Sequence, residues 1–344
     1  MRIKKITIPP LEKSLISNKS NFIMQETRTR IEYVWLDGNT DLPEIRSKAR
    51  YVVFSGVGEP IPDWNFDGGS TNQGDLVNSD RLLVSERTYK DPFNDGGLIA
   101  FCEVLYHNKV PHESNSRTHL KSLLEKNPDA GYLAGMEQEF TFINPASLEP
   151  LGLLLSPKEQ GQYYCGAGCM NVIGRSIVSE FESKCLAAGI DLDGINAEVM
   201  PGQWEWQTSA QDPLKTADDI WVSRYILERV AETNAVIISY DPKPHPEMNG
   251  AGCHTNISTT KTRECFGYEE QKELMTHMTL DHADHIKVCG KGIKRRMTGE
   301  CETSDYREFS WGVGDRGASV RIPEKVSRDG KGYFEDRRPC SNID

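Results

Sequence analysis

Two glutamates, Glu137 and Glu139, stand two residues apart in the segment MEQEF. The surrounding pattern is that of a β-strand, in which residues two apart point to the same side. The two carboxylates would therefore project together from one face. Paired acids on a solvated strand face are common, so this spacing alone does not establish a site.

A second pair of acids, Glu198 and Glu205, lies in the segment NAEVMPGQWEWQ, residues 196–207. Pro201 and Gly202 suit the central positions of a type II turn, because proline fixes φ and glycine accepts a positive φ. A hairpin closed at this turn would place Glu198 directly opposite Glu205.

Such a hairpin would have an aromatic face and an acidic face. The aromatic face would carry Ala197, Val199, Trp204 and Trp206, and the other would carry Asn196, Glu198, Glu205 and Gln207. Directly opposed side chains have Cβ atoms ~5 Å apart, and two carboxylates there repel by about 3 kcal/mol at an effective dielectric of about 20. A hard divalent cation on oxygen ligands, or a proton on one acid, would remove this repulsion. The alternative is an exposed hairpin with screened charges.

His254 lies in the glycine-rich segment NGAGCHTN, residues 249–256. A lone histidine is usually a core or surface residue, and it would bind a metal only where carboxylates converge on it. The segment itself does not decide between these interpretations.

Arginines gather in the last third of the chain. Arg316 and Arg321 fall in RGASVRIP, and Arg337 falls in YFEDRR. The planar guanidinium suits carboxylates and phosphates, which makes these residues candidates for an anionic substrate, whereas surface pairing better explains Arg295 and Arg338. The sequence has neither a P-loop nor a dinucleotide-binding glycine motif after a strand, so a nucleotide would be held in another way.

These residues need a rigid frame, and the hydrophobic pattern predicts one of strands and helices. Strands are expected at 31–36, 49–54, 98–104 and 135–143, and helices at 114–126 (with Ser114 as its N-cap) and near 175–188, 216–233 and 269–288. The order predicts an α+β fold with an N-terminal arm at 1–29, a small β-rich domain at 30–110 and a larger domain at 111–344.

Composition excludes some classes of function. The formal net charge of -11 argues against nucleic-acid and membrane-surface partners, which need a basic face. The nine cysteines are odd in number and lack paired C-x-x-C spacing, so we expect reduced thiols in a cytoplasmic protein.

Eight motifs, in their order along the chain, resemble glutamine synthetase of the eukaryotic (type II) class. They are WNFDGGST (64–71), MEQEF (136–140), YYCG (163–166), NAEVMPGQWEWQ (196–207), NGAGCHTN (249–256), RRMTG (295–299), RGASVRIP (316–323) and GYFEDRRP (332–339). The resemblance runs from about Tyr33 to the end of the chain, and several motifs are too long for coincidence.

The resemblance implies a small β-grasp N-terminal domain and a larger catalytic domain with a twisted antiparallel sheet and flanking helices. That sheet would line a funnel, with ATP entering one end, glutamate the other, and two to three Mg²⁺ or Mn²⁺ ions between. The implied reaction joins ammonia to the γ-carboxylate of L-glutamate through γ-glutamyl phosphate, giving L-glutamine, ADP and phosphate.

The resemblance also implies roles for individual residues. One ion would be held by Glu139, Glu198 and Glu205, and the second by Glu137, His254 and Glu335. Glutamate would be bound by Asn249, Gly250, Arg296, Arg316 and Arg337, and ATP by Glu137, Glu205, Asn256, Ser258, Arg316, Arg321 and Tyr333. Arg316 and Arg321 would stabilise charge on the γ-phosphate during transfer.

Ammonium would bind at Asp67, Ser70 and Tyr164, and Glu302 would close over the intermediate on a flap. The catalytic residues implied are thus Asp67, Glu302 and Arg316. In the family, the loop that carries Asp67 comes from a neighbouring subunit, which implies a homo-oligomer, a decamer of two pentameric rings with shared active sites.

The flap departs from the family, because it reads Gly299-Glu300-Cys301-Glu302 where relatives have an aromatic residue and a histidine before the glutamate. We expect the acids Glu300, Glu302 and Asp305 to repel one another and to oppose closure. Two alternatives are a sibling ligase that joins another amine or acid, and a non-catalytic structural relative. The second would have lost metal ligands, and all six are present.

Overall fold

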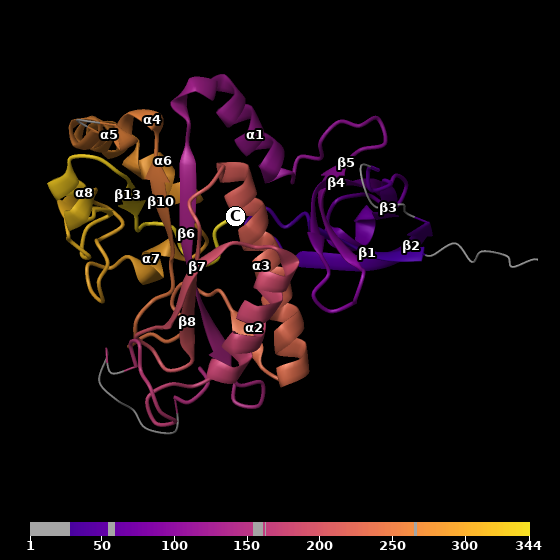
Figure 1. Cartoon of the computed structure of the whole chain (residues 1–344), viewed down its shortest axis with the longest axis horizontal. Coiled ribbons are helices and arrows are strands. Elements are labelled where there is room, and N and C mark those ends of the chain that lie inside the picture. The colour runs from indigo at the N-terminus through magenta and orange to yellow at the C-terminus, as the bar shows by residue number, and fades with distance from the viewer. Residues whose placement is uncertain (1–27, 54–58, 154–160, 162, 265–266) are drawn as a thin grey trace, which may run out of the picture.

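The computed structural model describes residues 28–53, 59–153, 161, 163–264 and 267–344. Figure 1 shows a smaller lobe of strands from the N-terminal third beside a larger lobe in which helices flank a long sheet. The predicted α+β fold is confirmed. Of the predicted arm at 1–29, residues 1–27 lie outside the described part of the chain, and Arg28 and Thr29 already belong to the first strand.

The smaller lobe is a five-stranded sheet with the order β2-β1-β5-β4-β3. Its strands are β1 (Arg28–Leu36), β2 (Ile45–Val53), β3 (Trp64–Asp67), β4 (Asp80–Lys90) and β5 (Leu98–Leu105). β1 pairs antiparallel with β2 and parallel with β5. Tyr33 and Trp35 pack into the core of this lobe, whereas Val34, on the opposite face of β1, joins the core of the larger lobe. Both faces of β1 are therefore covered, which explains its nearly unbroken hydrophobic run.

The larger lobe is built on an eight-stranded sheet with the order β11-β12-β13-β10-β6-β8-β7, in which β9 also pairs with β6. Its strands are β6 (Leu133–Ile143), β7 (Leu192–Ala197), β8 (Gln203–Thr208), β9 (Ile237–Ser239), β10 (Cys253–Ser258), β11 (Trp311–Val313), β12 (Val320–Ile322) and β13 (Phe334–Asp336). The pairs are antiparallel as expected, except β11 with β12, which is parallel.

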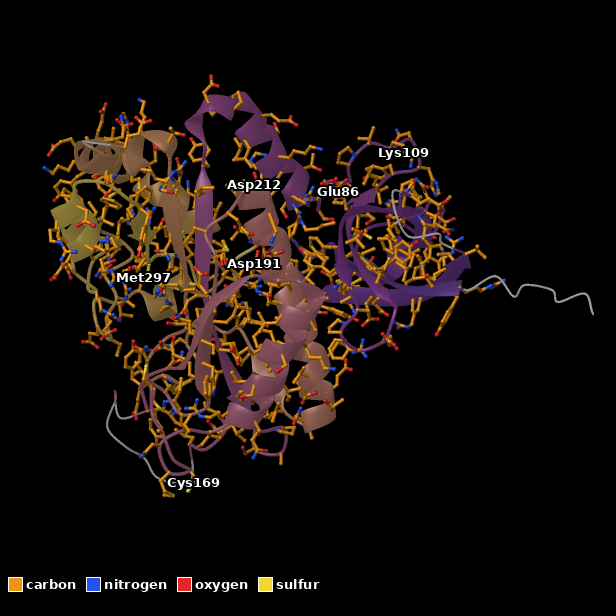
Figure 2. All side chains as sticks on the ribbon, viewed as in Figure 1. Glu86, Lys109, Cys169, Asp191, Asp212 and Met297 are labelled. Carbon is orange, nitrogen blue, oxygen red and sulfur yellow. The ribbon has the colours of Figure 1, made fainter. Side chains whose placement is uncertain are left out.

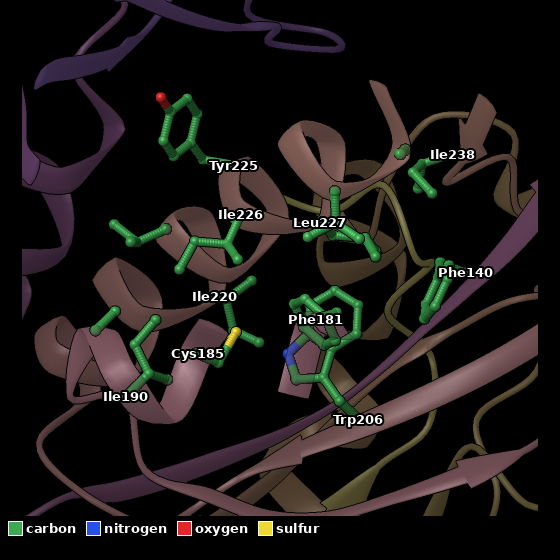
Figure 3. Close-up of a cluster of buried hydrophobic side chains, with 14 of the residues drawn as sticks. Phe140, Phe181, Cys185, Ile190, Trp206, Ile220, Tyr225, Ile226, Leu227 and Ile238 are labelled. Carbon is green, nitrogen blue, oxygen red and sulfur yellow. The ribbon is translucent and has the colours of Figure 1, made fainter. Parts of the chain in front are cut away.

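Eight α-helices surround this sheet in the described residues. They are α1 (Ser116–Lys126), α2 (Arg175–Ala188), α3 (Pro213–Asn234), α4 (Thr260–Arg263), α5 (Gly267–Leu280), α6 (His282–Val288), α7 (Ile293–Arg296) and α8 (Glu324–Asp329). α2 and α3 cover one face of the sheet through a core that Figure 3 shows in close-up. Trp206 lies at its centre, with ring centroids 5.5 Å from Phe140 and 5.1 Å from Phe181.

The hairpin between β7 and β8 has the predicted faces but not the predicted register. Gly202 has φ 71° and the Gln203 amide donates to the Met200 carbonyl, as a type II turn requires. The pairing nevertheless sets Asn196, rather than Glu198, opposite Glu205. The slip is two residues, and because side chains alternate with a period of two, it leaves the paired side chains on their predicted faces, whereas Val199, beyond the end of β7, lines the cavity on the acidic side.

Two predictions about helices were wrong in detail. Asn115, not Ser114, caps α1 by accepting a hydrogen bond from the Thr118 amide, whereas the Ser114 hydroxyl accepts one from Gln73. The single helix expected at 269–288 is divided at Asp281 into α5 and α6. The turn there buries His282, whose ring contacts the Tyr306 carbonyl at 3.0 Å.

A buried ionic cluster joins the two lobes. Asp218, on α3, accepts hydrogen bonds from Arg87 of β4 at 2.8 Å and from Arg117 of α1 at 2.8 Å. Beside it, Asp219 accepts one from the Tyr89 hydroxyl at 2.8 Å. Both aspartates are almost fully buried, so the charge of Asp218 depends on the two arginines for compensation, and Arg117 also donates to Glu86 and Glu103 at 3.0 Å.

We predict that Asp218→Ala lowers the free energy of unfolding by about 1–3 kcal/mol, because Arg87 loses its acceptor and Arg117 keeps only Glu86 and Glu103. Urea denaturation at fixed protein concentration measures the change. Asp284→Ala, which breaks an exposed pair with Lys287, is the matched control and should not shift the transition. Equal effects of the two substitutions would contradict a stabilising role for the buried ionic cluster.

Candidate functional site

One face of the larger sheet carries a row of polar side chains that the pairing brings side by side. Glu139 of β6 stands directly opposite Glu205 of β8. Glu137 of β6 stands opposite His254 of β10, and Asn256 of β10 stands opposite Glu335 of β13. Residues that face one another in such pairs have Cβ atoms ~5 Å apart, so the register alone gathers acids from three strands.

This face lines a cavity of about 380 Å³. Fourteen of the residues expected at the site line it: Glu137, Glu139, Tyr164, Glu198, Glu205, Asn249, Gly250, His254, Arg296, Glu302, Arg316, Arg321, Glu335 and Arg337. Because they come from distant parts of the sequence, their convergence supports one shared site.

Three carboxylates form the first cluster. Glu139, Glu198 and Glu205 are all buried, and one oxygen from each lies within 4.8 Å of the others. Within the described residues none of the three has an ion-pair partner, and their contacts are to neutral donors. The Gly252 amide donates to Glu139 at 2.5 Å and the Asn196 side chain donates to Glu198 at 2.9 Å. An all-oxygen, uncompensated donor set of this kind fits a hard divalent cation.

The electrostatics of this cluster favour a proton where no cation neutralises it. Burial, and then the charge of Glu139, raise the pKa of Glu198 to about 8. Burial and the surrounding carboxylates Glu139, Glu137 and Glu198 raise the pKa of Glu205 well above its ordinary value. The charge of Glu198 is thus one cause of the raised pKa of Glu205, although Glu139 is the residue directly opposite Glu205.

A second possible metal group combines Glu137, Glu205 and His254. The His254 Nδ1 atom lies 3.4 Å from a Glu137 oxygen, and its Nε2 atom lies 2.9 Å from the Arg296 guanidinium. Burial opposes ionisation of Glu137, but the hydrogen bond and charge of His254, with a hydrogen bond from Asn256, lower its pKa to about 2.

Glu335, expected as the third ligand of that second ion, is held by arginines. Its carboxylate accepts from Arg337 at 2.6 Å and pairs with Arg321 at 2.6 Å. It also lies 3.5 Å from the His254 Nδ1 atom. Glu335 can therefore turn toward a cation only as its contacts with these arginines loosen.

The residues expected to bind glutamate cluster beside the acids. The Gln203 side chain donates to the Gly250 carbonyl at 2.7 Å, and Arg296 donates to the carbonyls of Arg337 and Arg338. A Cβ at Gly250 would lie 2.8 Å from both an Arg296 carbon and the Pro242 carbonyl, so only glycine fits. The site thus has a rigid wall on this side.

Three residues expected to contact ATP lie outside the cavity lining. Asn256 donates to Glu137 at 2.9 Å, and the Ser258 hydroxyl accepts from Arg263 at 2.8 Å. Tyr333 is 39% exposed, and burial of its ring and the nearby Glu137 raise its pKa. All three flank the same end of the row of acids.

Asp67 and Ser70 lie far from this cavity in the same chain. Asp67 ends β3 and caps the short 3-10 helix Gly68–Thr71, accepting from the Ser70 hydroxyl at 2.8 Å. Figure 1 places β3 on the side of the smaller lobe away from β13. In Figure 2, Lys109, which pairs with Asp63 near β3, lies across the molecule from Met297, the neighbour of Arg296.

The flap lines the cavity through Cys301 and Glu302. Both residues adopt left-handed backbone angles, with φ 52° and 59°. The expected repulsion among three acids is wrong for Asp305, because three hydrogen bonds from Arg307 hold it and lower its pKa to about 2. Its charge is compensated locally and does not oppose closure.

Sequence reasoning missed the roles of Asn196 and Gln207. Gln207 donates to both Asn196, at 2.8 Å, and Glu205, and Asn196 donates on to Glu198. This amide chain holds two carboxylates in place while they repel each other. The sequence could have indicated these roles, since the hairpin pattern placed both amides on the same face as the two glutamates.

The fold and site together define a class: a protein with a buried cluster of carboxylates that could hold a divalent cation, beside a cluster of arginines suited to anions. The family model for the glutamine synthetase catalytic domain matches residues 113–341. The glutamine synthetase nodule isozyme of Medicago sativa is 43% identical over 342 residues, covering 96% of this chain and 95% of the relative. Cytosolic isozyme 1-1 of Arabidopsis thaliana is 42% identical with the same coverage.

The chain belongs to the glutamine synthetase family. Among solved structures, a Plasmodium falciparum glutamine synthetase matches with a TM-score of 0.73 at 17% identity, covering 94% of this chain and 70% of that one, which supports the fold. In the described residues, no helix is long and apolar enough to cross a membrane.

We predict that Mn²⁺ stabilises the metal-free protein more at pH 8 than at pH 6. A carboxyl with a raised folded pKa keeps a proton that the unfolded chain loses above about 4.5, so stability falls as pH rises from there to about 8. A cation that replaces this proton reverses the loss. Glu198→Gln should flatten the pH dependence and reduce the Mn²⁺ effect in thermal denaturation.

Glu273→Gln, at an exposed position of α5, is the control and should behave as the parent protein. A rise in melting temperature with Mn²⁺ that is equal at both pH values would rule out the carboxylate cluster as the cation site.

Proposed function

We propose that this chain is a glutamate–ammonia ligase that uses ATP to convert L-glutamate and ammonia into L-glutamine, ADP and phosphate. The observation that carries the proposal is the buried cluster of Glu139, Glu198 and Glu205, which forms no ion pair with any residue that the structure describes and lines an arginine-rich cavity. Relatives 42–43% identical over nearly the whole chain are named glutamine synthetases.

The residues present fit two divalent cations, Mg²⁺ or Mn²⁺, and a third is compatible with the family. Glu139, Glu198 and Glu205 would hold one ion, and Glu137, His254 and Glu335 the other, with Glu205 close enough to contact both. Bound cations would supply charge stabilisation for the phosphoryl group during transfer.

The arginines would position the two anionic substrates. Arg316 and Arg321 would neutralise the γ-phosphate, while Arg296 and Arg337 would hold glutamate with Asn249 and Gly250. Phosphoryl transfer to the γ-carboxylate makes γ-glutamyl phosphate, because a free carboxylate is a poor acyl donor. Catalysis then rests mainly on position and charge, which a rigid sheet supplies.

The ATP end of the cavity would be completed by Asn256, Ser258 and Tyr333. Tyr333 is well placed for a nucleotide, since it is partly exposed and close to Glu137. Asn256 would keep Glu137 oriented while contacting the nucleotide.

Ammonium would be bound and deprotonated by Asp67, with Ser70 and Tyr164. Hydrogen bonds from the Ser70 hydroxyl and the Gly69 amide lower the pKa of Asp67, which keeps it anionic and suited to a cation. Since Asp67 is remote from its own chain's cavity, we propose that it serves a neighbouring subunit. The assembly would be a homo-oligomer, a decamer of two pentameric rings.

Glu302 would then shield γ-glutamyl phosphate from water. Its backbone carbonyl accepts from Arg337 at 3.4 Å, which ties the flap to the glutamate end. We also propose a cytoplasmic location, in keeping with the cytosolic isozymes among the relatives.

The proposal predicts that ADP release requires glutamate, ammonium and Mg²⁺ together, and that glutamine forms in equal amount. Glu205→Ala should lower kcat/KM by more than the ~100-fold typical of outer partners of a metal site. Coupled ADP detection with each substrate omitted in turn is the measurement. A chain that releases ADP fastest with another amine is the sibling ligase, and one with no turnover under any condition is the non-catalytic relative.

The shared site predicts complementation between two inactive variants. In a 1:1 mixed oligomer of Asp67→Ala and Glu335→Ala subunits, about one interface in four joins two intact halves, so roughly a quarter of parental activity should return. Glu205→Ala mixed with Glu335→Ala is the control and should recover nothing, because both defects lie in one subunit's half. Failure of the first mixture in verified hetero-oligomers would place Asp67 outside the site.

A further inference from the structure

A fully buried glutamine stands in β6 between two acids of the functional site. Gln138 lies between Glu137 and Glu139, and because side chains alternate along a strand, it points to the opposite face of the sheet. Its partners across the neighbouring strands, Trp206 and Cys253, are themselves buried. An amide in such a core is costly unless each of its polar atoms has a hydrogen-bond partner.

The side chain of Gln138 has these partners. Its oxygen accepts from the Nε atom of Arg224 at 2.9 Å and from the Nη2 atom at 2.5 Å. Its nitrogen donates to the Glu139 carbonyl at 2.7 Å and to the Ser341 carbonyl at 2.9 Å. Since a guanidinium only donates, Arg224 decides which end of the amide faces it, and so turns the nitrogen toward Glu139.

The bond from Gln138 to the Glu139 carbonyl takes the place of a bond in the sheet. Gly252 precedes Cys253, the partner of Gln138, and the Glu139 amide donates to the Gly252 carbonyl at 2.9 Å. In a regular antiparallel pair, the Gly252 amide would donate back to the Glu139 carbonyl. Here it donates to the Glu139 carboxylate instead, at 2.5 Å. Gln138 thus satisfies the carbonyl that this amide does not reach.

Arg224, on α3, is the fixed point of this arrangement. It is 2% exposed, and within the part of the chain that the structure describes it has no acid at ion-pair distance. Its remaining bonds go to the carbonyls of Ser341 at 3.0 Å and Ile343 at 2.9 Å, and it lies 4.4 Å from the centroid of the Trp221 ring. A buried charge depends on such contacts, so the guanidinium cannot move without losing several of them together.

A second route leads from Arg224 to the same carboxylate. Ser341, whose carbonyl Arg224 holds, donates from its amide to the Ala251 carbonyl at 3.1 Å. Ala251 directly precedes Gly252, whose amide holds the Glu139 carboxylate. Both the carbonyl and the carboxylate of Glu139 are therefore held by contacts that trace back to one buried guanidinium.

We propose that Arg224 is a positioning residue for the cation site on the other face of the sheet. By fixing Gln138, it leaves the Gly252 amide free to hold one oxygen of Glu139, and the other oxygen remains available to a cation. The inference rests on the proposed function only in taking Glu139 as a metal ligand. Outer partners of metal ligands typically change metal affinity by about 10- to 100-fold.

An effect of charge alone would have the opposite sign. The positive charge of Arg224 repels a cation bound on the far side of the sheet, so its removal would strengthen binding if charge were all that mattered. Positioning predicts that binding weakens, even where the charge is kept. The direction of the change therefore separates the two explanations.

Mn²⁺ alone is the probe, titrated calorimetrically into the metal-free full chain. Gln138→Met, which nearly keeps the volume but removes both polar atoms of the amide, should weaken the tightest Mn²⁺ site by about 10-fold. Arg224→Lys, which keeps the charge but loses the fork of donors, should weaken it by a similar factor. Thermal denaturation without Mn²⁺ verifies that each variant is folded.

Two substitutions serve as matched controls. Gln271, on α5, is also fully buried, but neither polar atom of its side chain has a partner in the described residues. Arg229 lies on α3 like Arg224 and pairs with Glu232 near the surface. Gln271→Met and Arg229→Lys should each retain the Mn²⁺ affinity of the parent protein within about 2-fold.

The double variant Gln138→Met/Arg224→Met covers the case in which Gln138→Met alone does not fold. It replaces the whole polar pair by apolar groups, which is often neutral for stability. It should also bind Mn²⁺ about 10-fold more weakly than the parent protein. Parental or tighter Mn²⁺ binding in the folded double variant, in folded Gln138→Met or in folded Arg224→Lys would each overturn the proposal.

The same titrations separate this inference from the proposed function. A parent protein that binds Mn²⁺ but makes no glutamine contradicts the proposed ligase alone, and weaker Mn²⁺ binding in the variants would still support the role of Arg224. A parent protein that makes glutamine, with variants that bind Mn²⁺ equally well, contradicts the role of Arg224 alone. Absence of Mn²⁺ binding by the parent protein would overturn both.

Discussion

The structure depends on one electrostatic constraint: several carboxylates must be kept together on a face from which water is largely excluded. Glu139 and Glu205 oppose each other across neighbouring strands, and Glu198 joins them from the adjoining hairpin. Carboxylates repel one another strongly in such surroundings, so the structure behind them must hold them in place. An eight-stranded sheet with Trp206 and Phe140 packed behind it supplies that resistance, since moving one acid would break ladder hydrogen bonds and aromatic packing together.

The sequence predicted well those features that depend on the two-residue alternation of side chains along a strand. The two-residue alternation placed Glu137 with Glu139, and Glu198 with Glu205, on the acidic face, and this survived a two-residue slip in the hairpin. Register itself was not predictable, because it depends on where pairing resumes after the turn, and here the amide of Glu198 bonds to Gln203. The division of the expected helix into α5 and α6 at Asp281 was not predictable for a similar reason, since it depends on burial of His282 against a distant segment.

Contacts between residues far apart in the chain were beyond such reasoning. The motif resemblance named Glu335 as a ligand, but the pattern of local residues could not show that Arg321 and Arg337 hold its carboxylate. It also could not show that Arg307 compensates Asp305, although the two stand only two positions apart. In both cases the partner of a charged side chain is set by the final fold and not by a repeating pattern.

The backbone of the flap has a consequence for the timing of a catalytic cycle. Two successive residues with side chains, Cys301 and Glu302, hold left-handed angles, a conformation that costs of order 1 kcal/mol or more per residue outside glycine. The segment therefore stores backbone strain, and contacts such as that of Arg337 with the Glu302 carbonyl hold it in this conformation. A movement of the segment that returns both residues to ordinary angles would release this energy, so the strain shortens the time for which the flap keeps its present conformation.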